Sequence, residues 1–158
     1  MLNKTALFTS LALTATLSTF AAAEDNRPYL TTTKAMKGLQ ACQALAGENN
    51  WNMAVVIVDR GEDIKVSMRM DNALPAAYTG ATLKAITALS WSMPTHKVAE
   101  IAEKKPEFKL FPGIFPIGGG EPIFSESGKL IGAIGVAGGY VEHDQACAKA
   151  AVEAIKAS

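Results

Sequence analysis

The chain has two histidines, and each lies where the residue pattern predicts the start of a helix. His96 follows Pro94 and Thr95, so it falls in the first turn of its helix, where the partial positive charge disfavours imidazolium. A neutral imidazole is the form that binds transition metals such as iron. We therefore take His96 as the candidate metal ligand, with an exposed surface histidine as the alternative.

His143 is the weaker of the two candidates. It stands between Glu142 and Asp144 at the start of the last predicted helix. These carboxylates favour the charged imidazolium, which does not bind a metal. Neither histidine belongs to an H-x-x-H or H-E-x-x-H array, so a zinc hydrolase is poorly supported.

Several charged residues are candidates for binding an anion or an ion. Lys84 borders the alanine face of a predicted helix, where it either extends to solvent or pairs with an anion. Arg69 has the better geometry for a bidentate carboxylate contact. Asp71 is a candidate internal partner of either, so a structural salt bridge is the alternative. Glu100 and Glu103, one helical turn apart, could bind iron or calcium, although such pairs are usually only solvated.

Three consecutive glycines, Gly118, Gly119 and Gly120, offer backbone amides that could hold an anion. No Gly-Lys-Ser/Thr follows and the next element reads as a strand, so this is neither a P-loop nor a dinucleotide fingerprint. A structural turn is the alternative. Gly132 and Gly135 lie inside the following predicted strand and indicate close approach by a helix or a ligand.

The elements that must position these residues can be read from the hydrophobic pattern. We expect helices over 31–46, 76–91, 96–104 and 141–156, and strands over 51–59, 63–70, 121–125 and 129–137. Thr31, Thr32 or Thr33 is expected to cap the first helix and Thr95 the third. Segment 108–115 is a loop or a short strand. The two hairpins predict an antiparallel sheet with helices on its faces, hence an α/β (α+β) fold.

Composition and the N-terminus limit the class of protein. A short basic region, an apolar run and small residues at 21–23 predict a signal peptide over 1–23, followed by a single domain over 24–158. The apolar run is too short for a membrane span of about 20 residues, so we expect a periplasmic or secreted protein with no membrane span after signal removal. The 15 basic and 15 acidic residues balance, which gives no electrostatic argument for nucleic-acid binding.

The two cysteines, Cys42 and Cys147, would meet an oxidising compartment if the chain is exported. Cys42 lies on the inward face of the first predicted helix, and Cys147 borders the inward stripe of the last. A disulfide is sterically feasible if those helices are neighbours. Two buried free thiols are the equal alternative.

Several segments together resemble the GlcG/HbpS-like family, which includes the C-terminal domain of PduO-type proteins. They are Arg69-Met70-Asp71, the helix around Lys84, the glycine-proline-isoleucine stretch over 116–123, the glycine-rich strand over 132–136 and the Asp144-Gln145-Ala146-Cys147-Ala148 helix. The resemblance covers residues 30–155. It implies a profilin-like, five-stranded antiparallel sheet flanked by helices, often in dimers or higher oligomers.

The resemblance also implies a ligand, because several members bind haem. We expect an exported, homo-oligomeric haem-binding protein that sequesters or senses haem, with His96 as the iron ligand. Met93, Phe111 and Phe115 would form an apolar wall, and Arg69 or Lys84 would lie near the propionates. A haem-degrading or other small-molecule enzyme is one alternative, although no catalytic constellation is recognisable. An accessory small-molecule-binding or assembly protein that never binds haem is another.

Overall fold

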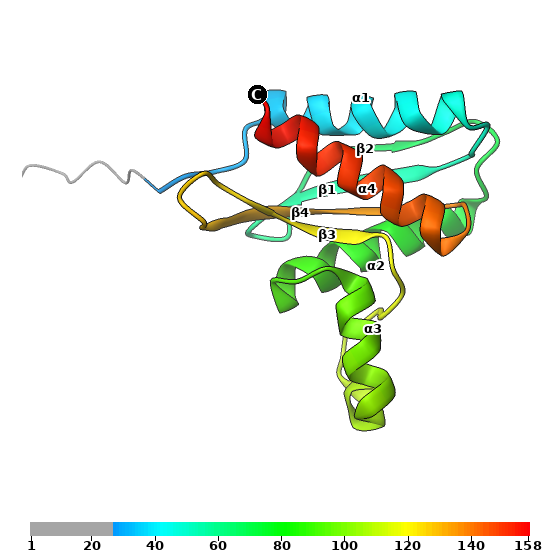
Figure 1. Ribbon diagram of the computed structural model, residues 1–158, viewed down its shortest axis with the longest axis vertical. Coiled ribbons are helices and arrows are strands. Elements are labelled where there is room, and N and C mark those ends of the chain that lie inside the picture. Colours follow the sequence, from blue (N-terminus) through cyan, green and yellow to red (C-terminus); the bar gives the residue numbers. More distant parts are fainter. Residues whose placement is uncertain (1–26) are drawn as a thin grey trace, which may run out of the picture.

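The computed structural model describes residues 27–158, so the predicted signal peptide lies outside the described residues. The elements follow the order that the sequence predicts (Figure 1). The helices are α1 (Thr32–Glu48), α2 (Pro75–Trp91), α3 (Thr95–Lys104), the short 3-10 helix η1 (Pro106–Leu110) and α4 (Val141–Lys156). The strands are β1 (Ala54–Asp59), β2 (Ile64–Arg69), β3 (Gly120–Phe124) and β4 (Leu130–Ala137).

The strands form one antiparallel sheet in the order β2-β1-β4-β3, with the two hairpins joined through the central pair β1 and β4. Helices α1 and α4 lie together on one face of this sheet, and α2 covers the other face (Figure 1). Helix α3 extends away from the sheet at the β3 side, followed by η1. The layered α+β class expected from the sequence is therefore confirmed.

The expectation of five strands is wrong, because the described residues form a sheet of four. Segment 108–115, expected as a loop or a short strand, contains the end of η1 and a loop, so it adds no fifth strand. Gly113 in that loop adopts φ +79°, which lies outside the β region of regular strands. The aromatic residues of this segment pack on the end of α2 and not on a neighbouring strand.

The two faces of the sheet bury different kinds of side chain. Towards α1 and α4 the core contains large aliphatic residues such as Val55, Ile57 and Ile134. Towards α2 it is built largely of alanine, which lets that helix come close to the sheet. A Cβ at Gly135 would lie only 1.9 Å from the carbonyl oxygen of Ala81. The close approach indicated at Gly135 is therefore made by α2, whereas Gly132 lies against Val58 of β1 and the side chain of Leu30.

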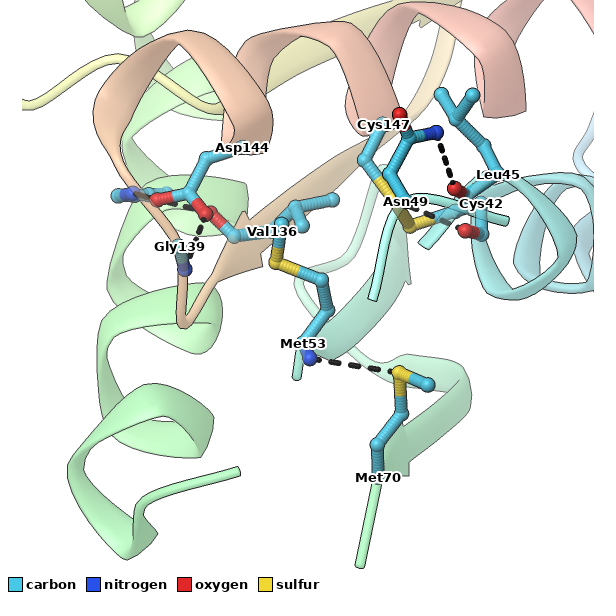
Figure 2. Close-up of a disulfide and its surroundings, with 10 residues drawn as sticks. Cys42, Leu45, Asn49, Met53, Met70, Val136, Gly139, Asp144 and Cys147 are labelled. Atoms are coloured by element: carbon cyan, nitrogen blue, oxygen red, sulfur yellow. Dashed lines mark hydrogen bonds and ion pairs between the residues drawn. A yellow bond between two sulfur atoms is a disulfide. The ribbon is translucent and has the colours of Figure 1, made fainter. Parts of the chain in front are cut away.

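A disulfide joins the two helices that share one face of the sheet (Figure 2). Cys42 of α1 and Cys147 of α4 are fully buried, and their Cα atoms lie 4.7 Å apart. The bond closes a loop of 105 residues, and restricting the unfolded chain in this way stabilises the fold by roughly 4–5 kcal/mol. Of the two alternatives for these cysteines, the structure therefore has the disulfide.

Candidate functional site

A buried ion pair lies where the glycine-rich segment meets α4. The Nζ atom of Lys84, on α2, is 2.7 Å from Oδ2 of Asp144 and 3.0 Å from the carbonyl oxygen of Val136. The other carboxylate oxygen of Asp144 accepts the backbone N–H of Gly139 at 3.1 Å (Figure 2). Both charged side chains are about 3% exposed. Lys84 thus connects α2 with α4 on the other face of the sheet. This is the structural salt bridge given as the alternative role of Lys84, but its partner is Asp144 and not Asp71.

The glycine triplet makes room for this pair. Gly119 has φ +114°, and a Cβ there would lie 2.7 Å from Cβ of Asp144 and 3.0 Å from Nζ of Lys84. Gly120 likewise lies against the backbone of Lys84. Gly118, Gly119 and Gly120 are all buried. The geometry matches a structural turn packed against side chains, and not an exposed row of amides.

The Asp144 carboxyl shows how strongly this region is shielded from water. Burial raises the pKa of Asp144 above its ordinary value, and the hydrogen bond and charge of Lys84 oppose that rise. Removing either partner would leave the other charge buried without compensation, which is strongly destabilising. The pair therefore serves the fold, and Lys84 is not free to meet an external anion without breaking it.

His96 lies at the N-terminus of α3, as the sequence predicts. Its ring is partly exposed, but Nδ1 is buried and has no hydrogen-bond partner among the described residues. Burial lowers the pKa of His96, and the positive charges of Lys97 and Lys149 lower it further. The lowered pKa favours the neutral imidazole, which is the form that binds iron.

The neighbouring Thr95 has a different role from the one expected. The N-cap of α3 is Pro94, and Thr95 makes no capping hydrogen bond. Its buried hydroxyl accepts the backbone N–H of Gly120 at 2.8 Å instead. This contact fixes the start of α3 against the edge strand β3. It therefore positions His96 relative to the glycine-rich segment.

An aromatic group lies at the end of α2. Phe108 and Phe111 pack edge-on against Trp91 with ring centroids 5.5 and 5.9 Å apart. Phe111 is 59% exposed, and the backbone N–H of Phe115 is held by Thr87 Oγ1 at 2.9 Å. Trp91 was not selected from the sequence. Its position at the end of a predicted helix, shortly before Pro94, was the available sign of a role.

Arg69 and His143 belong to other elements than His96, whereas Glu100 lies one turn away on α3 and favours the charged form of His96. Arg69 is on β2, at the opposite sheet edge from β3, and donates to the carbonyl of Ala73. His143 stacks on Trp51 with ring centroids 4.2 Å apart. Glu100 pairs with Lys97 at 2.9 Å, and the described residues hold no cluster of three or more potential metal ligands.

Glu121 was also missed by the sequence reasoning. It lies on β3, is only 9% exposed, and its Oε1 has no hydrogen-bond partner among the described residues. Burial raises the pKa of this carboxyl, while Lys149 and Lys156 oppose the rise. In the sequence, Glu121 directly follows the glycine triplet, and nothing in that pattern predicts that its side chain is buried. An unpaired buried carboxyl is costly, so Glu121 is a sensitive point of the fold.

The fold and these residues define a small α+β domain with a glycine-rich hairpin clamped between helices. A family model described as "Haem degrading protein HbpS-like" matches residues 30–153. An uncharacterized 15.0 kDa protein of Citrobacter freundii, from a dhaT-dhaS intergenic region, is 33% identical over 131 residues, covering 78% of this chain and 90% of that protein.

Solved structures agree with this match. The crystal structure of HbpS is 33% identical, with a TM-score of 0.75, and the match covers 80% of this chain and 90% of HbpS. The crystal structure of a PduOC:heme complex is 28% identical, with a TM-score of 0.74, and covers 80% of this chain and 95% of that one. The chain belongs to the HbpS-like family.

Haem binding is supported by these relatives, and the residues present fit the group in one respect and not in another. A partly exposed imidazole with a lowered pKa suits haem iron, and the exposed ring of Phe111 suits a porphyrin face. Of the two expected propionate partners, Lys84 is already paired and Arg69 lies across the sheet. Within residues 27–158, no helix is both long and apolar enough to cross a membrane.

Proposed function

We propose that this protein is an exported haem-binding protein that sequesters or senses haem and acts as a homo-oligomer. The observation that carries the proposal is the state of His96: its pKa is lowered, and its buried Nδ1 has no hydrogen-bond partner among residues 27–158. The match to a PduOC:heme complex supports the same ligand class. When bound, haem would supply the iron chemistry, and this chain would supply the axial imidazole and an apolar wall.

In this proposal the haem lies at the start of α3. His96 binds the iron, and Met93, Phe111 and Phe115 contact the porphyrin face. Trp91 supports Phe111 from behind. A buried disulfide supports export, because such bonds persist in oxidising compartments such as the periplasm. Amino-terminal sequencing of the exported chain tests the cleavage after residue 23.

The decisive experiment is a haemin titration of the chain from residue 24 onward, followed by Soret absorbance, beside His96→Ala. We expect saturable binding that weakens and changes spectrum in the variant. Because the pKa of His96 is lowered, the wild-type spectrum should keep its histidine signature to a lower pH than the ordinary histidine value of about 6.5. The matched control is His143→Ala, which should leave the spectrum unchanged.

The same experiment distinguishes haem binding from two other functions. The family description favours haem degradation, so loss of the Soret band with a reductant present would replace sequestration with turnover. Absence of any saturable Soret shift in either protein would remove haem and leave an accessory small-molecule-binding or assembly protein. Sedimentation velocity of the same samples tests the oligomeric state.

A further inference from the structure

A cleft of about 760 Å³ lies at the end of the α1–α4 pair that is remote from Asp144. The walls come from the chain entering α1, the hairpin between β3 and β4, and the C-terminal turn of α4. The apolar part of the lining contains Tyr29, Phe124, Ile131 and Ile155. Its volume is within the range of small-molecule sites, about 300–1,000 Å³.

Basic side chains line the same cleft. Lys34 comes from the first turn of α1 and Lys156 from the last turn of α4. These two ends are adjacent, because Gly38 of α1 lies against Ile155 of α4. Arg27 adds a third basic side chain to the lining, and Glu126 is the acidic one. The cleft therefore has a net positive charge.

The two lysines make no close polar contact among the described residues, although the charge of Lys156 acts on the buried carboxyl of Glu121. Within residues 27–158, neither ammonium group forms an ion pair with a carboxylate or donates a hydrogen bond to an acceptor. Lys34 is nonetheless half-buried beside the apolar wall. Unpaired cations next to apolar surface attract a molecule that is apolar at one end and negatively charged at the other.

We propose that this cleft binds a small amphipathic carboxylate, with its apolar body against Phe124, Ile131 and Ile155 and its carboxylate between Lys34 and Lys156. The site is separate from His96, which lies at the start of α3, and it does not depend on haem binding. Tyr29, which lines the cleft and is 69% exposed, would contact the ligand body.

The test is isothermal titration calorimetry of the chain from residue 24 with decanoate, beside 1-decanol as the uncharged analogue. We expect saturable binding of decanoate, at least tenfold weaker binding of 1-decanol, and an affinity for decanoate that falls with added salt. The Lys34→Gln/Lys156→Gln double variant should bind decanoate at least tenfold more weakly. Tyr29→Ala should weaken both compounds by removing an apolar contact.

Two control variants check that decanoate binding depends on this cleft. Lys104→Gln/Lys109→Gln removes the same charge from exposed positions elsewhere and should bind decanoate as the wild type does. His96→Ala should also bind decanoate normally, whatever its effect on haem. Circular dichroism melts confirm that each variant is folded. The proposal is overturned by absence of saturable heat up to about 1 mM decanoate, by equal affinity for 1-decanol, or by wild-type affinity in the Lys34/Lys156 double variant.

Discussion

At the scale of single residues, charge burial determines which side chains are available to a ligand. Lys84 was a natural candidate for binding an anion, but its ammonium is held by Asp144 and Val136 in a region shielded from water. His96 differs, because burial lowers its pKa and so favours the neutral form while its ring stays partly exposed. The two residues therefore separate into a structural role and a candidate ligand role.

The Lys84–Asp144 pair gives a prediction at this scale. Asp144→Asn should lower the free energy of unfolding by about 3–5 kcal/mol, because it leaves the buried ammonium of Lys84 without a counter-charge. Urea unfolding at pH 7 measures this. The matched control is Glu100→Gln, which makes the same acid-to-amide change in an exposed pair and should leave the urea midpoint unchanged. A small effect of Asp144→Asn would mean that water reaches the pair.

Glu121 gives a prediction of pH dependence. Its pKa is raised in the folded chain, so the native state holds this proton more tightly than the unfolded state does. Its contribution to stability must then decrease as pH rises from the unfolded value, about 4.3, through the folded one. Glu121→Gln should therefore become more stable relative to wild type as the pH rises from 4 to 7.

Chemical unfolding of both proteins at a series of pH values tests that prediction. Glu126→Gln, on the exposed β3–β4 turn, is the control and should show no such trend. A difference between wild type and Glu121→Gln that stays constant with pH would show that the carboxyl of Glu121 has the same pKa in the folded and unfolded chains, as a solvated side chain does.

At the scale of elements, the close approach of α2 to the sheet depends on the absence of side chains. Gly135→Ala should destabilise the fold by about 3 kcal/mol, because the added carbon would lie 1.9 Å from the carbonyl oxygen of Ala81. Gly47→Ala, near the end of α1, has nothing within 4 Å of the new carbon. It should be neutral or stabilising by up to about 1 kcal/mol. Thermal melts of the two variants compare them, and equal melting temperatures would contradict a steric limit at Gly135.

The capacity of the edge strand β3 to pair with another chain also depends on contacts between elements. Pro122 has no N–H to offer a further strand, and the N–H of Gly120 is taken by Thr95. Both features reduce the capacity of this edge to pair with another chain. The sequence predicted both α3 and β3, but it placed Thr95 as a cap because local spacing says nothing about a partner 25 residues away.

At the scale of the whole molecule, the disulfide ties the first and last helices together. Cys42→Ala/Cys147→Ala should lower the free energy of unfolding by about 4–5 kcal/mol, because the unfolded chain regains the freedom of a 105-residue loop. Guanidinium unfolding of the variant and of wild type gives the difference. Wild type unfolded with a reductant present should behave like the variant, and a difference under about 1 kcal/mol would contradict stabilisation by loop closure.

The sequence by itself determined the order and type of the helices and strands, because hydrophobic periodicity, caps and turns are recorded in neighbouring residues. It placed Lys129–Ala137 as a strand and Val141–Lys156 as a helix to within one residue of the structure. It also carried the family, through the glycine-rich hairpin and the helix that follows it.

Only the tertiary structure decided which distant groups meet. The partner of Lys84 is 60 residues away and that of Cys42 is 105 residues away, so both depend on how the layers pack. The same holds for the cleft between Lys34 and Lys156, which come from opposite ends of the described chain. Local pattern constrains each element separately, whereas burial and pairing arise when the elements are assembled.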